Sequence, residues 1–227
     1  MTPLVASAAE GALQLSVDGG GSAAVKLFLL LTALSFATAI LISITSFTRI
    51  VIVLSFLRQA LGTPQLPPNP VLIALGLALS AFVMAPTGAR VWDEGLGPYL
   101  DGTMEAGVAF ERASAPVREF LLRHTREGDL RLFYEIAGEA RPERGEAIPL
   151  SVAVPAFMVS ELTTAFRMGL FLYVPLLLVD LIVAAILMSL GMMMVPPNLI
   201  SLPVKIGVFL LADGWQLVVG SLARSFA

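Results

Sequence analysis

The sequence predicts an all-α integral membrane protein of long apolar helices with one polar helical insertion, and three observations support this fold class. Of the 227 residues, 57% are hydrophobic and 14% are charged, whereas soluble domains average about 45–50% apolar and about 25% charged residues. Several uncharged stretches reach the roughly 20 residues that a helix needs to cross a bilayer. The charged residues gather in 90–147, so that the chain is apolar, then polar, then apolar.

Composition also limits the function classes that fit the chain. The absence of cysteine excludes disulfides and cysteine-based metal sites. The single histidine, His124, argues against a histidine-based metal or catalytic site and is expected to be solvated or interfacial. The net charge of −3 provides no basic surface for nucleic acid. We therefore expect no catalytic residue, cofactor, metal or nucleic-acid partner, and a soluble helical adaptor does not fit the composition.

Residues 1–25 are expected to form a flexible N-terminal arm, because they are small, polar and rich in glycine. Ala6-Ser7-Ala8 has the small-residue spacing of a signal-peptidase site, but too little apolar sequence and no basic residue precede it. Both an ordinary alanine-rich arm and the remnant of a removed signal peptide fit this segment.

Residues 26–89 are expected to form the first apolar helical hairpin. Its first helix is predicted near 27–57 and its second near 71–89, because both stretches are long and almost free of charge. Arg58 and the turn-forming sequence GTPQLPPNP (62–70) separate the two helices.

Residues 90–147 are expected to form a polar helical region outside the cytoplasm. Within it, Ser114 and Pro116 are typical of a helix start and Gly138 of a helix stop, with apolar residues at helical spacing between them. Gly128-Asp129 marks a point at which this helix can break into two.

Residues 148–227 are expected to form the second apolar helical region, with helices near 168–191 and 199–222 and a Met-Pro loop between them. Prolines interrupt this region repeatedly. So do six charged residues, which are Glu161, Arg167, Asp180, Lys205, Asp213 and Arg224.

The positive-inside rule predicts an orientation for these helices. Arg49 and Arg58 mark the first short loop as cytoplasmic, which places 90–147 outside. The Met-Pro loop then faces inward, and both termini face outward.

Three charged residues stand out in the second apolar region. Asp180 and Lys205 lie within runs that could span a membrane, and Glu161 lies just before one. A lone charge at mid-bilayer costs about 2.5–3.5 kcal/mol on insertion scales. Such residues either line an ion or substrate pathway or pair across helices or subunits, and the alternation of acids and bases favours pairing. A third alternative is that the apolar helices lie in a protein assembly whose interior resembles lipid.

Met192, Met193 and Met194 stand between a glycine and a double proline. Methionine is flexible and fills irregular gaps, and proline ends the helix. The three side chains either pack a core or form a hydrophobic constriction that closes a pore by dewetting. If the protein forms a ring, each subunit adds one copy of this loop at the axis.

Long stretches of the chain resemble the FliP family of flagellar membrane proteins of the type III export gate. These stretches are ITSFTRIVIVLSFLRQALGTPQLPPN (44–69), PVREFLLRHTREGDLRLF (116–133), SELTTAF (160–166), LMSLGMMMVPP (187–197) and LPVKIGVFLLADGWQLVVGSLARSF (202–226). The resemblance runs from about Leu27 to Phe226. LGTPQLPPN and DGWQLVVGSLARSF are similar to the flagellar branch and differ from the injectisome branch.

The resemblance implies a pore-forming subunit that is not an enzyme. Such subunits form a ring, expected to be a pentamer, which with FliQ and FliR passes unfolded flagellar substrates. The ring lies within the basal body at the bacterial inner membrane, with much of it above the membrane plane, which favours the alternative of apolar helices buried in a protein assembly. Its helices are expected to be bent hairpins. Met192, Met193 and Met194 match the family's methionine loop, a seal around the channel. Glu161 and Lys205 match positions that pair between adjacent subunits, and Asp180 matches another acidic position. The alternatives are an injectisome-type gate subunit and a secondary transporter or ion-conducting subunit.

Overall fold

The structure is a computed structural model that describes residues 20–138, 148–192 and 194–226. Over these residues the chain forms helices and turns and no strand, which confirms the all-α prediction. The chain divides into two units, Met1–Ile42 and Ser43–Ala227. In chain order the helices are α2 (Gly20–Ser43), α3 (Phe47–Ala60), α4 (Asn69–Val91), the π-helical turn η1 (Trp92–Leu96), α5 (Gly97–Leu100), α6 (Ala106–His124), α7 (Glu127–Ala137), α8 (Leu150–Ser189), α9 (Asn198–Leu211) and α10 (Gly214–Arg224).

Three helices are long and apolar enough to cross a membrane: Ala24–Ser43, the continuous run Asn69–Leu100, and α8. The bent pair of α9 and α10 passes the same test if it counts as one span. The prediction of long apolar helices is therefore confirmed. The predicted arm 1–25 lies mostly outside the described residues, and its last part already belongs to α2.

The helix predicted near 27–57 is wrong as one element, because the chain breaks between Ser43 and Phe47. The hydroxyls of this segment make bonds that compete with helix continuation. Thr45 Oγ1 accepts a hydrogen bond from the Phe47 N–H at 3.4 Å, and the Ser46 hydroxyl bonds the Ser80 hydroxyl of α4 at 3.1 Å. A side-chain hydrogen bond thus connects the broken segment to α4.

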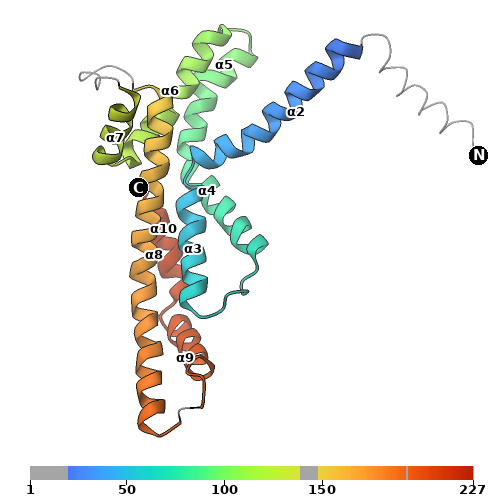
Figure 1. The fold of residues 1–227 in the computed structure, drawn as a ribbon. Helices are drawn as coiled ribbons and strands as arrows, with labels where there is room; N and C mark the ends of the chain where they lie inside the picture. Colours follow the sequence, from blue (N-terminus) through green and yellow to red (C-terminus); the bar gives the residue numbers. More distant parts are fainter. Residues whose placement is uncertain (1–19, 139–147, 193, 227) are drawn as a thin grey trace, which may run out of the picture. The chain divides into compact units, whose positions relative to one another are not determined.

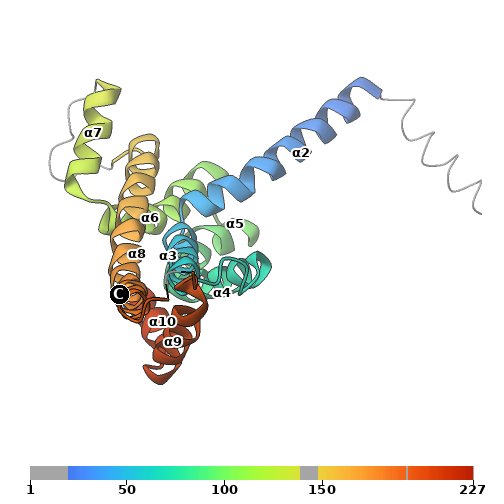
Figure 2. The same ribbon diagram turned by 60° about the horizontal axis from the view of Figure 1, so that its bottom comes forward.

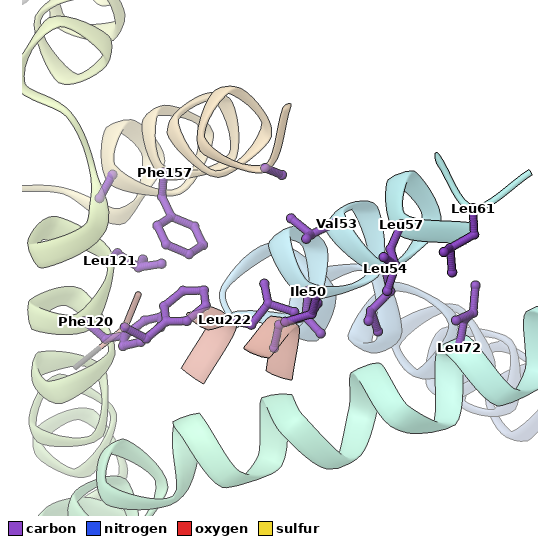
Figure 3. Packing of buried hydrophobic residues seen from close by; sticks show 14 residues of the cluster. Ile50, Val53, Leu54, Leu57, Leu61, Leu72, Phe120, Leu121, Phe157 and Leu222 are labelled. Atoms are coloured by element: carbon purple, nitrogen blue, oxygen red, sulfur yellow. The ribbon is translucent and has the colours of Figure 1, made fainter. Parts of the chain in front are cut away.

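The core of the second unit forms where α3 packs against its neighbours. Apolar residues of α3 recur at the spacing of one helix face and are fully buried. Figure 3 shows these side chains meeting those of α6, α8 and α10: Ile50, Val53, Leu54, Leu57, Phe120, Leu121, Phe157 and Leu222. In Figure 1, α3 lies alongside the middle part of α8, and Figure 2 shows it between α8 and α4.

The helical stretch predicted within 114–138 of the polar region forms parts of two helices, α6 and α7, and only some of its predicted bounds are correct. Pro116 lies inside α6, which starts at Ala106, so Ser114 and Pro116 do not mark a helix start. The break between α6 and α7 falls at Thr125 and Arg126, just before Gly128, where both residues are extended. The predicted stop is confirmed, because Gly138 ends α7 in the left-handed conformation with φ of 68°.

The last apolar region differs from prediction in both of its helices. α8 is one helix of 40 residues that continues through Pro155 and Pro175, whereas a helix was expected only near 168–191. The helix expected near 199–222 is instead bent by 64° between α9 and α10. At this bend Asp213 adopts a positive φ of 49°, which aspartate tolerates better than most residues.

Candidate functional site

The methionine stretch forms an exposed turn at the end of α8. Gly191 has φ of 74° and allows the chain to reverse, after which α9 begins at Asn198. The side chain of Met192 is 42% exposed and that of Met194 is 95% exposed. Met193 lies outside the described residues. In this single chain neither described methionine packs into the core, and the turn stands at one end of the long α8 (Figure 1).

Glu161 is fully buried on α8, and its partner is Arg49 of α3. Arg49 Nε donates a hydrogen bond to Glu161 Oε2 at 2.8 Å, and Nη2 donates to Oε1. Arg49 Nη1 donates to the carbonyl oxygen of Ser225 at 3.0 Å and to its hydroxyl at 2.9 Å. The guanidinium also lies 3.8 Å from the ring centroid of Phe226. This ion pair thus joins α3, α8 and the segment that follows α10.

Lys205 of α9 pairs with Asp180 of α8. Lys205 Nζ donates to Asp180 Oδ2 at 2.5 Å and to the Ala60 carbonyl at 3.0 Å, and Lys205 is buried. A pocket of about 310 Å³ adjoins this pair, lined by polar residues that include Gln59, Asn198 and Ser201. The pair therefore joins α8, α9 and the end of α3 beside a polar cavity.

The structure thus brings Asp180 and Lys205 together and gives Glu161 a different partner within the chain. Pairing of Glu161 with Lys205 between adjacent subunits stays a prediction. Sequence reasoning used Arg49 only as an indicator of orientation and missed its role as the partner of Glu161. The signal was present, because Arg49 interrupts a long apolar run and a charge in such a run normally has a partner.

Next to Glu161, Ser160 fixes the junction of α6 and α7 to α8. The buried Ser160 hydroxyl accepts a hydrogen bond from the Arg126 N–H at 3.0 Å and donates one to Asp129 Oδ2 at 2.5 Å. Two consecutive residues of α8 therefore hold the polar region on one side and α3 on the other.

His124 lies where the polar region meets the C-terminal segment. Its ring centroid is 4.6 Å from that of Phe120 and 5.2 Å from that of Phe226, so His124 is half-buried rather than fully solvated. Burial lowers the pKa of His124 below its ordinary value, and Arg49 and Arg123 act in the same direction.

A second group of charges lies on the surface of the polar region. Arg90 Nη1 donates to Glu119 Oε2 at 2.6 Å, and Nε donates to Glu94 Oε1 at 2.8 Å. The hydrogen bond from Arg90 holds the pKa of Glu119 below its ordinary value. Exposed pairs of this kind contribute little to stability. Over the described ranges no group of three or more histidine, aspartate or glutamate residues could hold a metal ion.

Comparison with known proteins gives consistent matches over nearly the whole chain. The sequence profile of the FliP family matches residues 30–222. The chain is 50% identical to the flagellar biosynthetic protein FliP of Pectobacterium carotovorum subsp. carotovorum, over 100% of this chain and 89% of the relative. It is 51% identical to that of Bacillus subtilis (strain 168), over 90% of this chain and 93% of the relative. It is also 51% identical to that of Aquifex aeolicus (strain VF5), over 89% of this chain and 85% of the relative.

Proposed function

The chain belongs to the FliP family of flagellar biosynthetic proteins, and from this premise we propose that it is a pore-forming subunit of the flagellar type III export gate. The predicted resemblance to flagellar rather than injectisome proteins is thereby confirmed. The chain is a membrane protein of the export apparatus. In the proposed role it forms a ring, expected to be a pentamer, with FliQ and FliR in the bacterial inner membrane. Unfolded flagellar substrates pass along the axis of this ring, and no enzymatic step is required of the subunit.

The exposed methionine turn carries this proposal. Met192 and Met194 are flexible apolar side chains that lack a core position in the single chain. When copies of the turn meet at an axis, such side chains exclude water and yet deform around a passing chain. The turn is therefore suited to a compliant seal.

The two ion pairs support the same role by fixing the helices that present the turn. The Asp180–Lys205 pair holds α9 against α8, and the Arg49–Glu161 pair holds α3 against α8. Residues 90–147 form the extracytoplasmic part of the subunit, between the apolar regions 26–89 and 148–227. Of the two arginines that predicted this orientation, Arg58 lies in the last turn of α3, next to the loop that leads to α4, whereas Arg49 is buried in an ion pair with Glu161.

The test replaces Met192, Met193 and Met194 together with alanine and measures small-ion leak across the inner membrane alongside export of flagellar proteins. We expect more leak from a complex that still assembles, because alanine removes the side chains that fill the constriction. The matched control is Met188→Ala, which changes an exposed methionine in the last turn of α8. Unchanged leak with a normal complex would show that the seal lies elsewhere.

One observation favours a second candidate, an ion-conducting or transporter subunit: the Asp180–Lys205 pair borders a polar pocket. An ion pathway needs these two groups to titrate or move. The double variant Asp180→Asn/Lys205→Met removes both charges without leaving one unpaired. Export that continues in this variant argues for the gate, whereas abolished ion movement with intact assembly argues for the transporter.

A further inference from the structure

Oxidisable sulfur is exposed at the methionine turn. The chain has nine methionines and no cysteine, so all of its sulfur atoms are thioethers. Among the described methionines, the side chains of Met188, Met192 and Met194 are exposed, and Met194 is the most exposed of them at 95%. The remaining described methionines are half-buried: Met84, Met104, Met158 and Met168. A reagent dissolved in water therefore reaches the turn more easily than it reaches these half-buried side chains.

The backbone of the turn keeps the two sulfur atoms of Met192 and Met194 away from the core. The Met192 N–H donates to the Leu187 carbonyl at 2.9 Å, and the Gly191 N–H donates to the Met188 carbonyl at 3.1 Å. With Gly191 at φ of 74°, these two bonds form the Schellman arrangement that ends many helices. The direction of the turn is thus set by main-chain hydrogen bonds, and its side chains are left exposed.

A peroxide converts an exposed thioether into a sulfoxide. The sulfur lone pair attacks one oxygen of hydrogen peroxide, the O–O bond breaks and an S–O bond forms. The proton of the transferred oxygen moves to the leaving hydroxide, which departs as water. The thioether is oxidised by two electrons and the peroxide is reduced by two. A polar, chiral side chain then replaces a flexible apolar one.

We infer that Met192 and Met194 form a peroxide-sensitive modification site, and that their oxidation opens the seal formed by the methionine turn. The site follows from the exposure of the two side chains, whereas its effect on the seal rests on the proposed function. In the proposed ring, copies of the turn line the axis along which substrates pass, and a molecule as small as hydrogen peroxide reaches them there. A hydrophobic constriction closes by excluding water. Sulfoxides bind water, so oxidised turns hydrate and pass small ions.

The first experiment tests the site without reference to a pore. Hydrogen peroxide is added to the purified full chain in detergent and to assembled gates in inner-membrane vesicles, and sulfoxides are located by peptide mass spectrometry. Met192 and Met194 should be oxidised severalfold faster than the half-buried Met168 in both samples. The difference should vanish in denaturant, which exposes all three side chains. Equal rates in either folded sample overturn the inference.

The second experiment measures small-ion leak across the same vesicles before and after peroxide, so that each variant is its own reference. Leak through the wild-type gate should rise severalfold. It should fall again after treatment with two methionine sulfoxide reductases, one for each sulfoxide epimer, and a dithiol. Met192→Leu/Met193→Leu/Met194→Leu should not respond, because leucine is apolar and has no sulfur. The matched control is Met188→Leu, which removes an exposed methionine outside the turn and should respond like the wild type.

Unchanged leak through a wild-type gate whose turn is oxidised overturns the inference, as does an equal rise in the triple leucine variant. The triple alanine variant of the same methionines separates this failure from that of the proposed function. If alanine raises the leak and oxidation does not, only the inference is wrong. If neither raises the leak, the seal lies elsewhere and both are wrong.

Discussion

Arg49 shows how a charged residue is kept inside an apolar helical protein. Removing two charges from water is costly, and the cost is recovered only when the geometry is good and the remaining donors are satisfied. Arg49 meets this condition through the Glu161 carboxylate, both oxygens of Ser225 and the face of Phe226. The pair therefore fixes how α3, α8 and the segment after α10 pack together. Apolar contacts are not directional and would fix this arrangement less precisely.

The first prediction removes one partner of this pair. Arg49→Met should destabilise the chain by about 3–5 kcal/mol, because it leaves the buried Glu161 carboxylate without its counter-charge. Arg49→Met/Glu161→Gln should recover much of this loss. The measurement is the thermal unfolding midpoint in detergent, with the exposed Arg112→Met as control. A single variant that unfolds at the wild-type temperature would contradict the buried pair.

The second prediction concerns His124 and pH. Its pKa lies below the ordinary value of 6.5 in the folded chain, so the unfolded chain binds the proton first as the pH falls. The contribution of neutral His124 to stability is therefore present above about pH 6.5 and is lost below it, as the pH falls through the folded-state pKa.

The measurement for His124 compares thermal unfolding at neutral and mildly acidic pH in the wild type and in His124→Gln. Glutamine cannot take up the proton, so this variant should lose less stability on acidification. Parallel losses in both chains would assign the effect to other groups, such as surface carboxylates.

At the scale of helices, the approach of α3 to α8 depends on the absence of a side chain at one position. A Cβ built on Gly169 of α8 would lie 2.6 Å from two ring atoms of Phe56, and the Phe56 ring also packs edge-on against Phe166 at 5.2 Å. The helices therefore meet closely where the core is formed.

The third prediction is that Gly169→Ala destabilises the chain by about 1–3 kcal/mol through overpacking, despite the better helix propensity of alanine. Phe56→Ala in the same chain should relieve the clash in part. Gly207→Ala on α9 is the matched control, because nothing lies within 4 Å of its added Cβ. Equal stability of the Gly169→Ala chain and the wild type would show that α8 can shift without cost.

The sequence predicted the helices best where the deciding signal is local. The methionine turn is bounded by glycine and proline, and Gly138 ends α7, so both were found from adjacent residues. The break at Thr45 was missed because hydropathy does not change there and Ser46 is bonded to Ser80 of another helix. The first part of α8 was missed because Glu161 makes it look unsuitable for an apolar helix until Arg49 is seen beside it. Pairing of charges depends on the tertiary arrangement, which a single sequence does not contain.

At the scale of the whole chain, many large apolar side chains remain exposed, including Phe82, Phe171 and Leu211. Monomeric soluble proteins rarely expose contiguous apolar surface of this kind. The exposed surface is expected to be covered by lipid, by other subunits or by both, as the proposed gate requires. The within-chain ion pairs, in contrast, need no partner subunit to form.

The fourth prediction distinguishes ion pairs within a subunit from pairs between subunits. Lys205→Glu should break assembly of the gate, because Asp180 then faces a second negative charge. Asp180→Lys in the same chain should restore assembly and export in part, since it re-forms the pair seen in the structure. If Lys205 pairs only within the subunit, Glu161→Lys combined with Lys205→Glu should not restore assembly, because it also places a positive charge beside Arg49. Rescue by this last combination alone would mean that Lys205 pairs across subunits in the ring.

Because α8 is one continuous helix between Glu161 and Asp180, the distance and the relative direction of these two side chains are fixed by the number of residues between them. One inserted residue would turn everything beyond it by about 100° and advance it by about 1.5 Å. Either Arg49 or Lys205 would then lose its carboxylate, and the methionine turn would point in a new direction. In an alignment of relatives, gaps should therefore be absent from this segment. Insertions or deletions in the loops between helices should therefore disturb the fold less than any change in the spacing of these two carboxylates.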